Sequence, residues 1–219
     1  MNYPRHLKTL AAAACILVMT GCATKTPFDY TAYKESRPRS ILVLPPINNT
    51  PEVPATYSVL SYATLPLAEA GYYVMPVTLV AEAFKENGMT QPSDMHSTSA
   101  EKLRQIFGAD AALYITITKY GTTYQVIDSA AVVSADAKLI DLKSGKVLWT
   151  GSASASSNEG KNQQGGLAGM LISAVVKQVL GTITDESHKV AGITTMRLLS
   201  PGRPNGVLYG PRSPHYGKD

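Results

Sequence analysis

Two segments decide the fold class of this chain: Ala111–Lys119, AALYITITK, and Ala137–Trp149, AKLIDLKSGKVLW. In the first, aliphatic residues at positions 113, 115 and 117 alternate with Tyr and Thr, and this period of two is typical of a half-buried β-strand. The second segment completes an alternating strand over 126–141, turns at Leu142–Lys146 and returns as a strand over 147–155. Gly145 suits the turn position that needs a positive φ. Together the segments predict an antiparallel meander in the second half of the chain.

The first half predicts strands that alternate with helices. Four consecutive aliphatic residues in Arg39–Leu44, closed by Pro45-Pro46, indicate a buried strand. A second short strand is expected over 72–75, and helices over 55–70 (with a kink or restart at Pro66), 76–86, 98–107 (capped by Thr98 with Glu101), 167–180 and 184–199. This order predicts an α/β or α+β fold, with one three-layer-like domain. Its sheet is expected to be mixed and flanked by helices, because the meander argues against a purely parallel sheet.

Composition excludes several classes of protein. Hydrophobic residues make up 44% of the 219 and charged residues 16%, which excludes disorder across the whole chain. Both cysteines, Cys15 and Cys22, lie at the N-terminus, so the rest of the chain holds neither a disulfide scaffold nor a cysteine metal site. The net charge of +4 falls to +2 when Arg5 and Lys8 leave with a signal peptide. No basic run accompanies it, so nucleic acid is not a predicted partner.

The N-terminus has the features of a lipoprotein signal peptide. A short basic region precedes an uninterrupted apolar run, Leu10–Met19, which fits a signal h-region and is too short to span a bilayer. Met19, Thr20, Gly21 and Cys22 then match a lipobox, although Leu is usual where Met19 stands. This match predicts cleavage after Gly21 and acylation of the Cys22 thiol, which would attach the protein to a lipid bilayer. An ordinary cleaved signal, or an apolar helix with an incidental cysteine, is the alternative.

The segment after Cys22 predicts where the protein is held. An Asp next to the acylated cysteine retains enterobacterial lipoproteins at the inner membrane, so Ala23 predicts the outer membrane, with the domain facing the periplasm. The chain is expected to consist of a signal peptide (1–21), a lipidated tether (22–38), an α/β domain (39–199) and a Pro/Gly-rich tail (200–219). The tail is expected to be extended or disordered. An edge segment lying on the domain is the alternative for the tether.

The mature sequence shows no set of residues typical of an enzyme or a metal site. His96, His188 and His215 have no second ligand at a metal-binding spacing, and the glycines at 165, 166 and 169 lack the strand and the Lys-Ser/Thr of a phosphate loop. Gly108-Ala109-Asp110 is better explained as a helix stop before a strand than as an acid in a cleft. The sequence therefore predicts no enzyme, no cofactor and no metal. A periplasmic hydrolase acting on cell-wall or nucleotide material is an alternative, with Asp110, Glu69, Asp94 and Asp128 as its candidate carboxylates.

Three tyrosines form a candidate interface. Tyr114, Tyr120 and Tyr124 gather with threonines around one strand and its loop, and tyrosine offers a large rigid contact area with a polar tip. The solvated side of a half-buried sheet would explain them equally. A lipid- or small-ligand-binding module is a further alternative, using the apolar helix that begins at Leu167. Basic residues at 197, 203, 212 and 218 could touch anionic surfaces, although a solvated tail is the simpler explanation.

Four segments together resemble a known family. They are RPRSILVLPPINNTPEV (Arg37–Val53), LPLAEAGYYVMPV (Leu65–Val77), FGADAALYITITKYGT (Phe107–Thr122) and AKLIDLKSGKVLW (Ala137–Trp149). They resemble a bacterial lipoprotein family of unknown function that includes a meningococcal vaccine-candidate antigen, over about residues 22–200. The resemblance implies an α/β domain similar to the amino-terminal domain of the Tol propeller protein and to the periplasmic domain of the curli-pore lipoprotein. It transfers no catalytic residue.

The resemblance and the lipobox together predict a non-enzymatic outer-membrane lipoprotein. Its periplasmic domain would bind other envelope proteins during assembly or export, and a curli-pore-like lipoprotein is the partner that the family suggests. The identity of the partner and the oligomeric state stay open.

Overall fold

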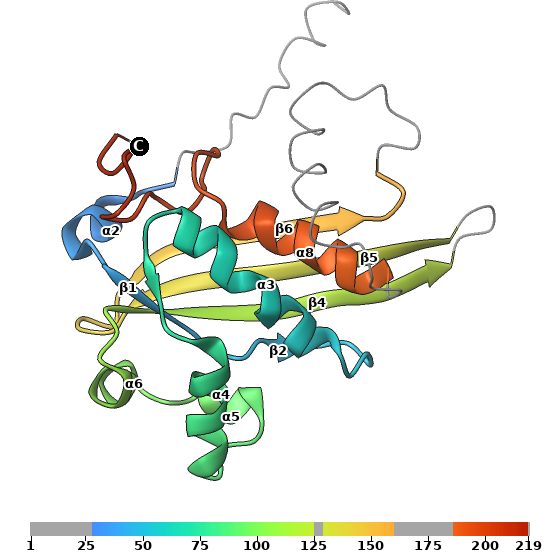
Figure 1. The fold of residues 1–219 in the computed structure, drawn as a ribbon, viewed down its shortest axis with the longest axis horizontal. Coiled ribbons are helices and arrows are strands. Elements are labelled where there is room, and N and C mark those ends of the chain that lie inside the picture. The colour runs from blue at the N-terminus through green and yellow to red at the C-terminus, as the bar shows by residue number, and fades with distance from the viewer. Residues whose placement is uncertain (1–27, 125–128, 160–185, 219) are drawn as a thin grey trace, which may run out of the picture.

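The computed structural model describes residues 28–124, 129–159 and 186–218 (Figure 1). Its elements, in chain order, are α2 (Thr31–Ser36), β1 (Ser40–Val43), β2 (Ile47–Asn48), α3 (Ala55–Glu69), β3 (Tyr73–Val74), α4 (Val77–Glu86), α5 (Pro92–His96), α6 (Ala100–Phe107), β4 (Ala111–Tyr124), β5 (Ser129–Asp141), β6 (Val147–Ser156) and α8 (Glu186–Leu199). The predicted signal peptide and the predicted helix over 167–180 lie outside the described residues.

The six strands form one open, mixed sheet, as the sequence predicts. Their order is β3-β1-β4-β5-β6. Strand β2 pairs with the same edge of β4 as β1 does, but nearer the C-terminal end of β4. The pairs β1–β3, β1–β4 and β2–β4 are parallel, whereas β4, β5 and β6 are the antiparallel meander. Gly145 has a φ of 71° in the β5–β6 turn, as expected from the turn sequence.

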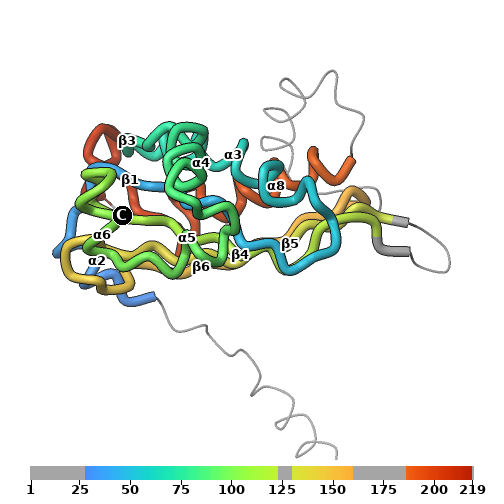
Figure 2. The backbone as a smooth tube through the Cα atoms, turned by 90° about the horizontal axis from the view of Figure 1, so that it is seen from below, coloured from blue at the N-terminus to red at the C-terminus, as the bar shows by residue number. Residues whose placement is uncertain are grey.

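Helices pack on both faces of the sheet around β1. Successive side chains of this strand point to opposite faces, so each face has its own apolar cluster. Ile41 and Val43 belong to the larger core cluster, with apolar residues of α3 and α8, whereas Leu42 and Leu44 belong to a second cluster with residues of α4, α5 and α6. Figure 2 shows α3 and α8 on one side of the long strands. Asp136, Lys138 and other polar residues of β5 and β6 are exposed on the other face, beyond α4–α6.

Three local predictions for the first half differ from the structure. Helix α3 runs through Pro66 without restarting, because this proline lies near its C-terminal end and is buried against the core. The predicted loop over 88–97 contains the short helix α5. Helix α6 begins one residue later than predicted: Ser99, not Thr98, is its N-cap, and Ser99 Oγ accepts a hydrogen bond from the Lys102 N–H at 3.3 Å.

The tail packs onto the domain instead of lying outside it. Val207 and Leu208 are buried in the larger core cluster. Trp149 Nε1 donates to the Asn205 carbonyl at 2.9 Å, and Tyr72 Oη donates to the Leu208 carbonyl at 2.7 Å. The described tail residues form no helix or strand, in keeping with their proline and glycine content, but buried side chains and these hydrogen bonds hold them in place.

The described part of the predicted tether also lies on the domain. Residues 31–36 form α2, and Tyr33 of this helix is buried in the larger core cluster. The Phe28 N–H donates to the Asn205 side chain at 3.0 Å, and Tyr30 Oη donates to the Gly206 carbonyl at 2.5 Å. The alternative of an edge segment lying on the domain therefore describes these residues better than a free tether.

Candidate functional site

Asp110 has a structural role at the start of the sheet. Its Oδ2 accepts hydrogen bonds from the backbone N–H of Arg39 at 2.9 Å and of Ser40 at 3.1 Å, and Ser40 Oγ donates to the same oxygen. Asp110 therefore joins the beginning of β1 to the beginning of β4. This arrangement supports the structural explanation of Gly108-Ala109-Asp110 over an acid in a cleft.

The other hydrolase candidates do not meet at one site. Glu69 ends α3 and Asp94 lies in α5, and both side chains are exposed. Neither carboxylate lines the groove or the cavity described below. Asp128 lies outside the described residues, as does the apolar segment from Leu167. The described hydrolase candidates, Glu69, Asp94 and Asp110, therefore give no pair for general acid–base chemistry.

Ser58 and His188 form a contact that the sequence does not indicate. Ser58 Oγ lies 2.6 Å from His188 Nδ1, and Tyr120 Oη donates to Ser58 Oγ at 3.0 Å. The atoms are those of a nucleophile and a base. However, Ser58 is only 5% exposed, and neither Ser58 nor His188 lines the groove or the cavity described below. The network joins α3, α8 and β4: Ser58 is 130 residues from His188 and 62 residues from Tyr120 in sequence, so no local motif reveals it.

The three tyrosines do not assemble one exposed surface. Tyr114 is buried in the cluster beneath α4–α6, whereas Tyr120 is buried in the cluster on the opposite face. A register shift between Ile117 and Lys119 adds one residue to β4 relative to β5 and reverses the alternation. Residues that a strict period of two places together therefore point to opposite faces. The side chain of Tyr124 lies outside the described part.

A polar groove of about 580 Å³ lies on the open face of the sheet. His96, at the end of α5, packs against the edge of the Tyr114 ring with centroids 5.1 Å apart, and Lys138 Nζ lies 5.2 Å from the centroid of the same ring. Burial lowers the pKa of His96; a hydrogen bond to the Pro45 carbonyl opposes this shift and the charge of Lys138 adds to it. The groove is further lined by Thr116, Asp136, Thr150 and Ser152.

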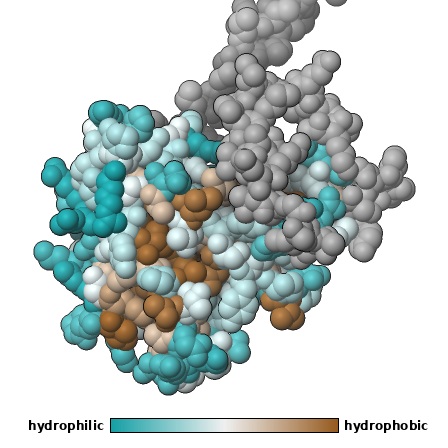
Figure 3. All heavy atoms as spheres, in the orientation of Figure 1, coloured by the Kyte–Doolittle hydropathy of each residue, from teal (hydrophilic) through white to brown (hydrophobic). Residues whose placement is uncertain are grey.

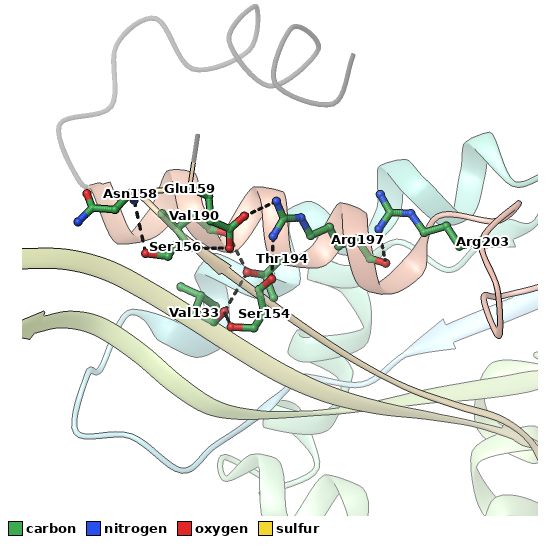
Figure 4. A network of polar contacts seen from close by, with 9 residues as sticks. All are labelled: Val133, Ser154, Ser156, Asn158, Glu159, Val190, Thr194, Arg197 and Arg203. Atoms are coloured by element: carbon green, nitrogen blue, oxygen red, sulfur yellow. Dashed lines mark hydrogen bonds and ion pairs between the residues drawn. The ribbon is translucent and has the colours of Figure 1, made fainter. Parts of the chain in front are cut away.

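Beside the groove, β6 forms the longer outer edge of the sheet. Its residues, VLWTGSASAS, contain no charged residue and no proline, the usual protections of an edge strand. No strand among the described residues pairs with its outer side, and the opposite edge strand, β3, has only two residues. Arg197 of α8 covers one point, since its Nη1 donates to the Ser154 carbonyl at 2.8 Å and its Nη2 pairs with Glu159 at 2.5 Å (Figure 4).

A second cavity, of about 350 Å³, lies between α2 and the tail. Tyr33 and Tyr72 line it, and their hydroxyl oxygens are 2.9 Å apart. The exposed side chains of Lys34 and Arg37 also line it. The cavity therefore combines an aromatic lining with two cations.

Apolar side chains also gather on the side of the molecule that Figure 3 shows, over the region where Figure 1 shows α3 and α4. The large exposed apolar residues of these helices include Leu65, which is 46% exposed, and Leu79, which is 68% exposed. Exposed apolar patches commonly mark contacts with other proteins or with membranes.

The predicted lipidation residues precede the first described residue. Acylation of Cys22, with Met19, Thr20 and Gly21 before it, therefore stays a prediction. Within residues 28–124, 129–159 and 186–218, no group of three or more His, Cys, Asp or Glu side chains could hold a metal ion. No helix in these ranges is long and apolar enough to cross a membrane.

Comparison with known proteins identifies relatives over most of the chain. A family model described as "Putative lipoprotein GNA1162-like" matches residues 28–212. The lipoprotein NMB1124/NMB1162 of Neisseria meningitidis serogroup B is 51% identical over 202 residues, which cover 91% of this chain and 93% of the relative. The crystal structure of lipoprotein GNA1162 from N. meningitidis is 54% identical with a TM-score of 0.54, and the match covers 66% of this chain and 100% of that chain.

A more distant likeness concerns the fold only. The PelC dodecamer from Paraburkholderia phytofirmans is 17% identical with a TM-score of 0.46, and the match covers 78% of this chain and 90% of that chain. This level of similarity carries no information about function.

Proposed function

The chain belongs to the GNA1162-like lipoprotein family, and from this premise we propose that it is a non-enzymatic lipoprotein whose domain binds other envelope proteins. Acyl chains on Cys22 hold it in the outer membrane, and the domain faces the periplasm. The family membership, which the four sequence segments predicted, and the lipobox support the anchor. The residue Ala23 supports the choice of membrane.

The outer side of β6, with which no described strand pairs, is the observation that supports the interaction. A strand with an unpaired outer side can bind an extended peptide by adding it to the sheet, with main-chain hydrogen bonds for affinity and adjacent pockets for specificity. The Ser154 carbonyl already accepts a hydrogen bond from outside the sheet, so Ser152, two residues away, presents its N–H and C=O in the same direction. The polar groove with Asp136 and Lys138 lies next to this edge.

The chemistry of the described residues favours binding over catalysis. Ser58 and His188 are close enough to exchange a proton, but Ser58 is buried and its contact joins three core elements. The carboxylates Glu69, Asp94 and Asp110 lie on separate elements. A periplasmic hydrolase is therefore the weaker interpretation of this chain.

Cavity size is the observation in favour of a lipid- or small-ligand-binding function. The cavity of about 350 Å³ between α2 and the tail and the groove of about 580 Å³ both fall within the range of small-molecule sites. The groove is the larger of these two. Its walls include His96, Asp136 and Lys138, so it suits a polar segment of a protein better than a lipid.

Affinity capture from detergent-solubilised envelopes tests the interaction. The bait is the full acylated chain, compared with Ser152→Pro, which removes the outward N–H from the β6 edge, and with Ser152→Ala, which keeps it. We expect the wild type and Ser152→Ala to retain the same envelope proteins and Ser152→Pro to lose them. Tryptophan fluorescence verifies that the variants are folded. Equal capture by all three would exclude the β6 edge, and no capture by the wild type above control would exclude the interaction.

The anchor is tested separately. We expect Cys22→Ala to abolish both palmitate labelling and membrane association. Labelling that persists in this variant would show that another residue is acylated.

A further inference from the structure

Basic side chains from distant parts of the sequence meet at one end of the domain. The segments that form this basic end are α2 with the following residues to 40, the β5–β6 turn, and the tail over 200–218, which Figure 1 shows close together. Ser36 Oγ of α2 donates to Asp141 at the turn, at 2.5 Å, and Tyr30 Oη donates to the Gly206 carbonyl of the tail. The basic residues of this end are Lys34, Arg37, Arg39, Lys143, Lys146, Arg203, Arg212 and Lys218.

The basic end carries more positive than negative charge among the described residues. Its carboxylates are Asp29, Glu35, Glu69, Asp110 and Asp141. Asp110 and Asp141 accept hydrogen bonds from neighbouring backbone N–H groups and so point into the protein. Glu35 lies 3.9 Å from Lys146, and both side chains are largely exposed. The outward field of this end is therefore set mainly by Lys and Arg.

The position of the anchor determines which end of the domain faces the bilayer. Phe28 is six positions after Cys22, and six residue steps of extended chain span at most about 21 Å. Phe28 is bound to the basic end through its hydrogen bond to the Asn205 side chain. An acylated Cys22 therefore keeps the basic end within reach of the lipid headgroups. This step rests on the acylation that the proposed function includes.

Aromatic side chains at the same end suit a membrane surface. Tyr73 is 45% exposed and Tyr216 is 42% exposed. The Arg212 guanidinium lies 5.6 Å from the centroid of the Tyr73 ring, so a cation and an exposed ring form one unit. Tyrosine is enriched at the headgroup level of membranes because its ring is apolar and its tip is polar.

The cavity between α2 and the tail lies at the basic end and combines cationic with aromatic side chains. Lys34 and Arg37 line its exposed part, and Tyr33 and Tyr72 line its aromatic part. Arg37 follows α2 with φ 47° and ψ 56°, a left-handed conformation that a residue with a side chain seldom adopts. Arg37 therefore occupies a helix-end position whose backbone conformation glycine would adopt with less strain.

From these observations we propose that the basic end binds anionic phospholipid headgroups of the membrane that carries the anchor, with Lys34 and Arg37 as the central contacts. Charge complementarity and the short tether select a bilayer surface as the occupant. The contact would orient the domain so that the basic end lies on the membrane.

Vesicle co-flotation of an unacylated protein tests this contact without the anchor. The chain begins at residue 22 with Cys22→Ser, and every residue of both core clusters lies between 33 and 208, so the core is complete. Vesicles contain phosphatidylcholine alone or phosphatidylcholine with 30% phosphatidylglycerol. We expect binding to the anionic vesicles only, weakened by 0.5 M NaCl, because salt screens exposed charges.

A matched pair of double variants locates the contact. Lys34→Gln with Arg37→Gln should weaken binding to anionic vesicles by about 25-fold, or about fivefold for each basic residue at the surface. Lys85→Gln with Lys119→Gln removes the same charge from exposed positions on α4 and β4 and should change binding less than about twofold.

Three results would overturn the proposal: no binding to anionic vesicles, equal binding to both kinds of vesicle, or equal effects of the two double variants. Capture of partners through β6 is unaffected by these outcomes, so failure here and failure of the protein interaction are distinguishable.

Discussion

Trp149 lies across Gly151 on β6, and we expect the substitution Gly151→Ala to displace its ring. A Cβ at position 151 would overlap Cζ2 of Trp149 and lie 2.6 Å from Cη2. Trp149 is 1% exposed, and its Nε1 donates to the Asn205 carbonyl at 2.9 Å. The ring can therefore move only by leaving its place in the core and releasing the tail.

The cost of this displacement follows from two contributions. Inserting a methyl group into a packed core costs about 1–3 kcal/mol. Losing a hydrogen bond such as that from Trp149 to Asn205 costs about 0.5–1.5 kcal/mol. Together they predict a loss of about 1.5–4.5 kcal/mol in the free energy of unfolding, a large share of the roughly 5–15 kcal/mol of an ordinary domain.

Urea unfolding followed by intrinsic fluorescence measures both parts of this prediction. Trp149 is the single tryptophan of the chain, so the emission reports on its surroundings directly. We expect Gly151→Ala to lower the urea midpoint and to shift the emission to longer wavelength. Gly145→Ala is the control: its φ is 71°, a Cβ there meets nothing within 4 Å, and it should cost about 1 kcal/mol without changing the emission. An unchanged midpoint and spectrum for Gly151→Ala would refute the packing argument.

Three further substitutions have expected outcomes that urea unfolding can measure. Although burial raises the pKa of Asp141, hydrogen bonds from Ser36, Ser144 and Lys143 bring it below its ordinary value of 3.8. Asp141→Asn should lower the free energy of unfolding by about 1–3 kcal/mol at pH 7. The difference in this free energy between the variant and the wild type should narrow as the pH falls below 3.8. A difference in unfolding free energy that stays constant as the pH falls would contradict this role of the Asp141 carboxylate. Burial lowers the pKa of His96 below 6.5, so its contribution to stability is complete above pH 6.5 and is lost as the pH falls through the lowered pKa. His96→Gln should remove this fall in unfolding free energy at acid pH. Equal pH profiles of stability for the variant and the wild type would argue against the burial of a neutral His96. Ser58→Ala takes a hydrogen-bond partner from both His188 and Tyr120 and should cost about 1–3 kcal/mol; an unaltered urea midpoint would mean that this network does not stabilise the core.

Local sequence patterns predicted much of the fold. The helix predicted over 76–86 corresponds to α4 at Val77–Glu86, and the strand, turn and strand around Gly145 match β5 and β6 closely. These features depend on side-chain alternation and turn residues within a few positions. Pro66 shows the limit of such signals, since burial against the core keeps α3 continuous where the proline alone predicts a break.

The candidate sites were predicted less well because they depend on contacts between distant residues. One extra residue in β4 places Tyr114 and Tyr120 on opposite faces, although a strict alternation puts them together. Ser58 and His188 meet across 130 residues. The tail after residue 200 has the composition of a flexible segment, yet Leu208 is buried against the core.

The sequence by itself determined the order of most helices and strands of the domain, without α2, β2 and α5, as well as the mixed sheet and membership of a lipoprotein family. It also predicts Cys22 as the anchor. These properties are carried by periodicity, turn residues and short motifs that neighbouring positions specify. The tertiary structure decided that β6 is the outermost of the long strands described, which side chains line the groove beside it, and that α2, the β5–β6 turn and the tail form one basic end. Burial and strand pairing are set by the whole assembled core, so no single segment contains them.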